Sequence, residues 1–142
     1  MKPTPWALVF GAWLVAAVST LGALFLSEVM YLPPCLLCWY QRVFMFPLVA
    51  VLAVGLFPFD RTVVRYAMPL ALAGWLVAVA HVLLMAGLIP EAAIPCTQGV
   101  PCSRIDFLLF GFLTLPMLSA VAFSAIGALL AAAHYSSRTD PT

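Results

Sequence analysis

The chain is organised around one stretch, Pro33-Pro34-Cys35-Leu36-Leu37-Cys38-Trp39-Tyr40-Gln41-Arg42. Two cysteines three positions apart stand where a proline-rich segment leads into a long apolar run. In a helix that begins here, a rotation of about 100° per residue puts Cys35 and Cys38 roughly 60° apart, with Arg42 between them. The positive end of the helix and the arginine both favour a thiolate, which is the form of cysteine that attacks disulfides. The stretch therefore predicts a helix start that carries a reactive cysteine pair.

The composition is that of a membrane protein. The 142 residues are 65% hydrophobic and only 8% charged, which is far more apolar than a soluble domain of this size needs to be. The charges fall between long uncharged runs, as they do in polytopic membrane proteins. The six lysines and arginines are scattered and form no basic patch, so we expect no nucleic-acid partner.

Four apolar runs have the length that suits a bilayer core, about 20 residues for roughly 30 Å. We expect an all-α integral membrane protein, with a four-helix transmembrane bundle forming a single membrane domain over residues 1–142. The first run continues beyond the apolar core of a signal peptide, which has about 7–15 residues, so we interpret it as a span. The predicted spans cover about residues 6–26, 35–57, 67–87 and 107–132, and the predicted external loops cover 27–34 and 88–106.

Prolines and small residues add detail to these spans. Pro47 and Pro116 are expected to kink the second and fourth spans, whereas Pro69 is expected in the first turn of the third. Asp106 or Ser103 is expected to cap the fourth helix. Small residues at every fourth position of that span predict close helix packing there: Ala120, Ser124 and Ala128.

The distribution of basic residues predicts the orientation. With four spans, both termini lie on the same side as the turn near Arg61. That side carries four basic residues and the other side carries two, which favours cytoplasmic termini under the positive-inside rule. All four cysteines of the chain then lie at the external face.

The cysteines form two pairs in sequence, Cys35 with Cys38 and Cys96 with Cys102. Disulfides persist outside the cytoplasm and are rare within it, so this placement favours redox chemistry. Two alternatives remain open: a pair of structural disulfides, and a zinc site with four cysteine ligands. Five residues separate Cys96 from Cys102, and neither loop contains a histidine, so we expect no metal site.

Two basic side chains are candidates for binding a redox cofactor. Arg42 shares a helix face with both sulfurs of the first pair, although an arginine can also extend to the membrane surface for structural reasons alone. His81 is predicted about two turns below the external end of the third span, at the depth of Arg42. Polar groups within spans are costly and often functional, but His81 can equally be a hydrogen-bonded residue inside the bundle.

Three motifs resemble those of a known family. They are Cys35-Leu36-Leu37-Cys38-Trp39-Tyr40-Gln41-Arg42, Val100-Pro101-Cys102, and Gly111-Phe112-Leu113-Thr114-Leu115-Pro116. With four spans and a second cysteine pair before the last one, the chain resembles the DsbB-type disulfide bond formation proteins over essentially its whole length, and especially their short, BdbC-like branch.

The resemblance implies an oxidoreductase of the bacterial cytoplasmic membrane that reoxidises a thioredoxin-like dithiol oxidase outside the cell membrane. The electrons would pass to the membrane quinone pool, with menaquinone or ubiquinone as the cofactor. By this analogy the partner, a DsbA-like or BdbD-like protein, attacks Cys96, and Cys102 then turns to Cys35. Cys38 would face the quinone ring, with Arg42 and His81 beside it.

In one respect the chain departs from the longer members of the family, in which the second cysteine pair is widely separated. A reductase resembling the vitamin K epoxide reductases is an alternative, but in those the paired cysteines open the last helix of the bundle rather than the second. A metal-handling membrane protein with a four-cysteine site and a purely structural protein with four spans are further alternatives.

Overall fold

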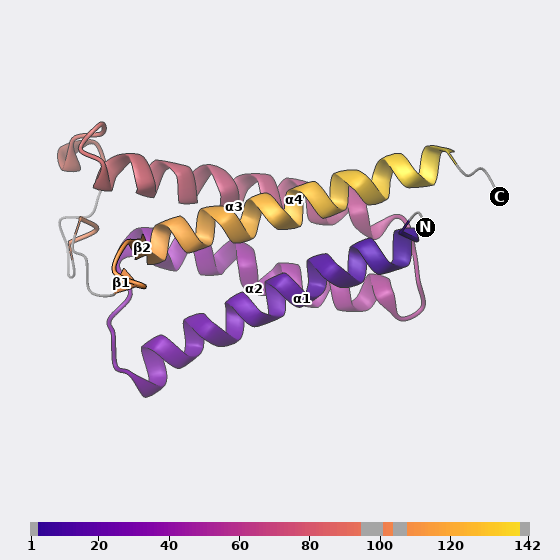
Figure 1. Cartoon of the computed structure of the whole chain (residues 1–142), viewed down its shortest axis with the longest axis horizontal. Helices are drawn as coiled ribbons and strands as arrows, with labels where there is room; N and C mark the ends of the chain where they lie inside the picture. The colour runs from indigo at the N-terminus through magenta and orange to yellow at the C-terminus, as the bar shows by residue number, and fades with distance from the viewer. Residues whose placement is uncertain (1–2, 95–100, 104–107, 140–142) are drawn as a thin grey trace.

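The computed structural model describes residues 3–94, 101–103 and 108–139, and these residues form a bundle of helices (Figure 1). The long helices are α1 (Pro5–Leu24), α2 (Leu36–Leu56), α3 (Val63–Met85) and α4 (Leu115–Thr139). The short elements are a π-helical turn, η1 (Phe25–Val29), that continues α1, a 3-10 turn, η2 (Glu91–Ala93), and two antiparallel strands, β1 (Leu108–Leu109) and β2 (Leu113–Thr114).

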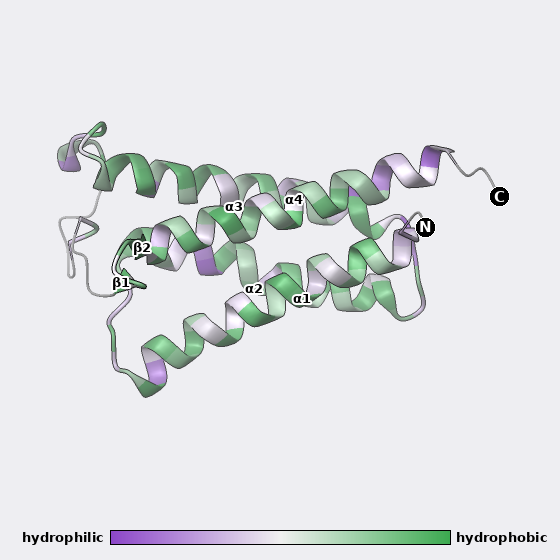
Figure 2. Ribbon diagram, viewed as in Figure 1, coloured by the Kyte–Doolittle hydropathy of each residue, from purple (hydrophilic) through white to green (hydrophobic). Residues whose placement is uncertain are grey.

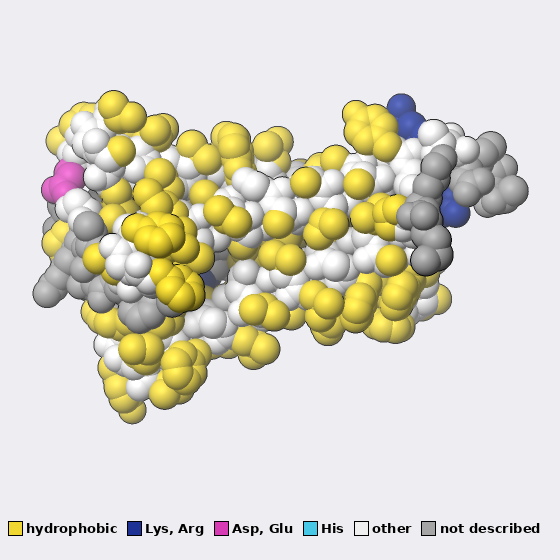
Figure 3. All heavy atoms as spheres, in the orientation of Figure 1, with side chains coloured by type: hydrophobic (Ala, Val, Ile, Leu, Met, Phe, Trp, Pro, Cys, Tyr) yellow, Lys and Arg dark blue, Asp and Glu magenta, His cyan; other side chains and the backbone are white. Residues whose placement is uncertain are grey.

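Four helices in the described residues have the length and hydropathy to cross a bilayer. Figure 2 shows apolar residues along most of each long helix, and Figure 3 shows hydrophobic side chains over the flank of the bundle. Large apolar residues such as Val43, Val54, Leu72 and Leu76 are exposed, as expected of residues that face lipid. The predicted fold class, an all-α bundle with four candidate spans, is confirmed.

Consecutive helices pack side by side, and α1 also packs against α4, so the four helices close into a ring. Helix α1 begins at the end of the bundle where α4 terminates, and the turn between α2 and α3 lies there too (Figure 1). The β1–β2 hairpin and the start of α2 lie at the opposite end. The cysteine-bearing end is therefore the end that is remote from both termini, as an even number of spans requires.

Each helix contributes a buried face with helical periodicity to one core. Residues spaced by three or four positions lie on one side of a helix, and the core residues follow this rule: Val9, Ala12 and Ala16 in α1, Leu48, Leu52 and Leu56 in α2, Ala67, Ala71 and Ala78 in α3, and Phe123, Ile126 and Leu130 in α4. Of the small residues predicted to pack closely in the fourth span, Ala120 packs against the core, whereas Ser124 and Ala128 are exposed. Buried alanines lie in α1, α3 and α4.

Gly55 and Gly74 permit the closest approaches between helices. A Cβ atom on Gly74 would overlap the ring of Phe123, and one on Gly55 would overlap the branched side chain of Val63. Val63 is 5% exposed and its Cβ belongs to a rigid β-branched side chain, so it has little freedom to move aside.

We expect Gly55→Ala to destabilise the bundle by about 1–3 kcal/mol, the usual cost of overpacking. Gly127→Ala is the matched control, because Gly127 is also helical and nothing lies within 4 Å of its added Cβ; alanine there should be neutral or stabilising by about 1 kcal/mol. Thermal unfolding in one detergent measures both variants. Equal stability of the two variants would show that the Gly55 contact is not tight.

The fourth helix begins later than the sequence predicts. Residue 107 lies outside the described residues, and residues 108–114 form the β1–β2 hairpin instead of a helical turn. Phe110 (φ 58°) and Gly111 (φ 82°) adopt the left-handed conformation at its tip, which a continuous helix excludes. Pro116 consequently sits in the first turn of α4, where a proline is tolerated, rather than at a kink.

Other boundaries shift as well. Helix α3 begins at Val63 rather than near residue 67, so Pro69 lies inside the helix beyond its first turn. Pro47 lies inside α2 as expected. Helix α4 extends to Thr139, whereas the sequence places the end of the helix near residue 132. Ser137 and Thr139 donate side-chain hydrogen bonds to carbonyls one turn earlier, which accommodates polar residues in a helix.

Candidate functional site

The predicted helix start at the first cysteine pair is present, with Cys35 as the N-cap residue of α2. The backbone of Cys35 is extended (φ −71°, ψ 171°), and its Sγ accepts a hydrogen bond from the backbone N–H of Cys38 at 3.4 Å. The two sulfur atoms lie 2.9 Å apart, and both cysteines are free thiols. Capping therefore holds the two sulfurs of the pair together at the positive end of the helix.

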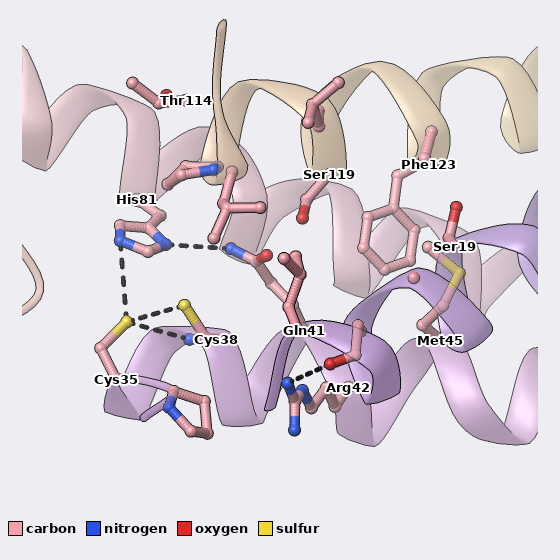
Figure 4. Close-up of a pocket in the computed structure, with 18 of the residues that line it drawn as sticks. Ser19, Cys35, Cys38, Gln41, Arg42, Met45, His81, Thr114, Ser119 and Phe123 are labelled. Atoms are coloured by element: carbon pink, nitrogen blue, oxygen red, sulfur yellow. Dashed lines mark hydrogen bonds between the residues drawn. The ribbon is translucent and has the colours of Figure 1, made fainter. Parts of the chain in front are cut away.

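His81 of α3 is 2% exposed and contacts three residues, of which Cys35 and Gln41 are labelled in Figure 4. Its Nε2 lies 3.8 Å from Cys35 Sγ and 3.0 Å from the carbonyl oxygen of Cys102. Its Nδ1 lies 3.1 Å from Nε2 of Gln41, one turn after Cys38 on α2. The histidine thus joins the first cysteine pair, the segment that carries Cys102, and a buried amide.

Cys102 lies beside the first pair in a second apolar cluster, with Cys35, Leu37 and Leu84. It is 2% exposed and disulfide-bonded. Cys96, the predicted other member of its pair, lies outside the described residues. The segment before the hairpin and the start of α2 are therefore in contact, although more than sixty residues separate them in sequence.

The surroundings of Cys35, which directly precedes the second span, stabilise its charged form. The hydrogen bond with the Cys38 thiol lowers the pKa of Cys35 below its ordinary value of 9.0. Burial opposes this effect, while the His81 ring and the backbone N–H of Cys38 add to it. In the doubly reduced pair the negative charge is therefore better stabilised on Cys35 than on Cys38, the cysteine that the family resemblance places beside the quinone.

Arg42 points towards α1. One of its terminal Nη atoms donates a hydrogen bond to the carbonyl oxygen of Ala23 at 2.9 Å, and its guanidinium lies 5.5 Å from the centre of the Trp39 ring. The π-helical turn begins two residues after Ala23, and such turns interrupt the regular hydrogen-bond ladder of a helix. Arg42 therefore ties the start of α2 to the end of α1.

A cavity of about 730 Å³ opens beside the cysteine pair, lined by residues of α1, α2, α3 and α4. Most of its lining is apolar, including Val18, Met45 and Phe46. The polar residues that line it are few: Ser19, Gln41, Arg42, His81, Thr114 and Ser119, together with Cys35, Cys38 and Cys102. A large apolar cavity with a few convergent polar groups is the usual form of a small-molecule site.

The cavity brings together Cys35, Cys38, Arg42, His81 and Cys102, five of the six residues predicted for the site. The sequence did not single out Gln41, Ser19 or Ser119. Gln41 was detectable in principle, because it stands three positions after Cys38 on the same helix face and is polar inside a predicted span.

Metal binding is the remaining chemical alternative for the cysteines. One ligand atom each from Cys35, Cys38 and His81 lies within 4.8 Å of the other two. The four-cysteine site considered from the sequence needs Cys102 as a thiolate, and its disulfide removes that ligand. The described residues thus provide a three-ligand cluster at most.

Comparison with known proteins identifies the family. The family model described as "Disulfide bond formation protein DsbB" matches residues 4–133. The "Probable disulfide formation protein" of Metapseudomonas resinovorans is 50% identical over 135 residues, covering 92% of this chain and 94% of the relative. "Disulfide bond formation protein C" of Bacillus subtilis (strain 168) is 39% identical over 118 residues, covering 83% and 86%.

A "Probable disulfide formation protein" of Coxiella burnetii (strain RSA 493 / Nine Mile phase I) is 41% identical over 131 residues, covering 90% of this chain and 88% of the relative. No solved structure gives a significant match. The family match spans all four helices and both described cysteine segments. The chain therefore belongs to the DsbB family of disulfide bond formation proteins.

Proposed function

We propose that this protein is a membrane thiol–disulfide oxidoreductase that reoxidises a thioredoxin-like dithiol oxidase outside the cytoplasm and passes the electrons to membrane quinone. The observation that carries the proposal is the position of the Cys35–Cys38 pair, which lines an apolar cavity together with Arg42. Disulfide exchange alone needs no such cavity, whereas transfer of electrons to a lipid-soluble ring does.

The cavity fits a quinone by size and by chemistry. Its volume, about 730 Å³, lies within the range of small-molecule sites, about 300–1,000 Å³. Arg42 carries a permanent charge that suits a carbonyl oxygen on which negative charge develops, and the hydroxyl groups of Ser19 and Ser119 are further donors on the wall. A quinone accepts two electrons and two protons, so one quinone balances the formation of one disulfide.

The contact between the segment of Cys102 and the start of α2 supports the following exchange steps. A thiolate of the partner attacks Cys96, and the bond between Cys96 and Cys102 breaks. The Cys102 thiolate attacks Cys35, and Cys38 leaves as a thiolate at the edge of the cavity. The partner's second thiolate then forms the partner disulfide and releases Cys96, which attacks Cys102 and frees Cys35.

After these steps Cys35 and Cys38 are both reduced, and they return to a disulfide when two electrons leave for the quinone. The state of the cysteines in the structure agrees with this reduced stage, because Cys35 and Cys38 are free while Cys102 is disulfide-bonded. Cys38 and Cys35 carry the negative charge at different stages of the reaction. Cys38 is the only thiolate of the first pair while Cys35 is bonded to Cys102, whereas Cys35 holds the charge once both are reduced.

Turnover by the purified protein tests the proposal. We expect the protein in detergent to oxidise a reduced thioredoxin-like dithiol protein and to reduce one quinone per partner disulfide formed. Ubiquinone and menaquinone analogues are compared in parallel, and Cys96→Ser serves as the inactive control. No turnover with either quinone type and several dithiol partners would contradict the proposal, and turnover that reduces partner disulfides would support the reductase alternative.

We also propose that both termini are cytoplasmic and that the cysteine-bearing end faces outwards, as the basic residues predict. A cysteine introduced at Tyr31, which is 83% exposed at that end, should react with a membrane-impermeant maleimide in intact spheroplasts. A cysteine introduced at Arg61, in the exposed turn before α3, is the control and should react only after lysis. The reverse labelling pattern would show that the termini are external and that the cysteine-bearing end is cytoplasmic.

A further inference from the structure

We propose that Gln41 is a positioning residue for the exchange between the two cysteine pairs, because it sets the tautomer of His81 that holds Cys102 against Cys35. This inference rests on the proposed function. It assigns a role to a residue for which neither the motifs nor the family match supplies one.

Gln41 is unusual in its surroundings. Its side chain is 6% exposed inside a helix that faces lipid and apolar core, and a buried primary amide is costly unless it is hydrogen-bonded. The hydrogen bond recorded for it joins its Nε2 to His81 Nδ1 at 3.1 Å. An amide nitrogen can only donate, so Nδ1 must accept with its lone pair, and a neutral imidazole then carries its proton on Nε2.

The other side of the ring selects the same tautomer independently. His81 Nε2 lies 3.0 Å from the carbonyl oxygen of Cys102, which can only accept. If the Gln41 amide were reversed, Nδ1 would carry the proton, and a bare Nε2 would face that carbonyl oxygen as two acceptors. Two contacts on opposite sides of the ring therefore agree, which also fixes the orientation of the amide.

The Nε2 proton has two neighbours, the carbonyl of Cys102 and the sulfur of Cys35 at 3.8 Å, the contact drawn in Figure 4. The Nε2–H group of His81 thus holds the backbone of Cys102, the attacking cysteine. The same group faces the sulfur of Cys35, which Cys102 attacks. Cys102 lies in a turn outside the helices and strands, and the contact with His81 joins this turn to α3. Gln41 does not touch the reacting sulfurs in any recorded contact, so its effect passes through His81.

Selective ¹⁵N-histidine NMR tests the tautomer directly. The chain has two histidines, so a His134→Asn background leaves only the signal of His81. We expect Nδ1 to resonate as the unprotonated nitrogen and Nε2 as the protonated one. In Gln41→Glu, whose carboxylate only accepts, Nδ1 should become protonated. A protonated Nδ1 in the Gln41 protein, or no change in Gln41→Glu, would overturn the inference.

Kinetics test the consequence. Gln41→Met keeps the approximate volume but removes the hydrogen bond, and kcat for partner oxidation should fall about tenfold to a hundredfold, as for a reacting group misplaced by about 1 Å. Gln41 also lines the cavity, so the rate at which a pre-reduced Cys35–Cys38 pair reduces quinone is measured as well, and kcat for partner oxidation should fall by the larger factor. The control is Ser124→Ala, which removes the hydrogen bond from Trp75 Nε1 at 2.9 Å, also between α3 and a neighbouring helix.

The outcomes separate this inference from the function on which it rests. A wild-type protein without turnover would refute the proposed function. Normal kcat in Gln41→Met, in a protein whose wild type turns over, would refute only the role of Gln41. An equal loss of kcat in Gln41→Met and Ser124→Ala would also refute it, because the loss would then come from general weakening of helix packing.

Discussion

Replacing Cys38 with serine should abolish quinone reduction, lowering turnover by about three orders of magnitude or more, as removal of an essential nucleophile does. Serine replaces one atom and preserves the helix start, but it forms no disulfide with Cys35. The sulfur of Cys38 lies 2.9 Å from that of Cys35 and lines the cavity, so it stands between the exchange steps and the electron acceptor. The measurement is quinone loss in the presence of excess reduced partner.

The same variant should also stop with its second cysteine pair reduced. Without Cys38, Cys35 forms no disulfide that Cys102, in the same buried cluster, can attack, so excess reduced partner leaves Cys96 and Cys102 as thiols. Alkylation of free thiols followed by peptide mapping should detect both cysteines in the reduced form. The control is Tyr40→Phe, a single-atom deletion at an exposed position of the same helix. More than about a tenth of wild-type activity in Cys38→Ser would contradict this route for the electrons.

Replacing Arg42 with methionine should raise the KM for quinone about tenfold to a hundredfold. A hydrogen bond from a charged donor contributes about 1.5–3 kcal/mol, and each 1.4 kcal/mol corresponds to about tenfold in binding. Methionine retains much of the apolar stem but removes the guanidinium that lines the cavity. Steady-state rates across a series of quinone concentrations measure the effect.

Arg65→Met is the matched control for the charge, since Arg65 is exposed near the start of α3 at the opposite end of the bundle. Arg42 also ties α2 to α1 through the carbonyl of Ala23, so thermal unfolding of both variants separates a loss of folding from a loss of binding. An unchanged quinone KM in folded Arg42→Met would show that Arg42 serves only the link between the helices.

The sequence predicted the four helices because hydropathy over about 20 residues is a strong signal. It did not predict the hairpin before α4, since the left-handed backbone at Phe110 and Gly111 leaves no mark on hydropathy. The tight contact of Gly55 with Val63 could not be predicted from the sequence either, because it depends on how α2 and α3 face each other across a turn.

The sequence predicted which residues of the site share a helix face, but it did not predict which partners their side chains contact. Helix periodicity placed Cys35, Cys38 and Arg42 on one helix face, and all three line the cavity. It could not show that the Arg42 side chain reaches Ala23 on another helix. His81 lines the same cavity as Arg42, but its contact with Gln41 depends on the rotation of α3 against α2, which no single-helix pattern contains.

A single turnover with only the first cysteine pair tests the central claim most directly. The Cys96→Ser, Cys102→Ser protein retains Cys35 and Cys38 as its only cysteines, since the chain has four. The reduced protein is mixed anaerobically with quinone, and both quinone loss and remaining thiols are measured. We predict one quinone reduced per protein, with loss of both thiols. Quinone that stays oxidised, or quinone reduction that leaves the two thiols intact, would contradict the account.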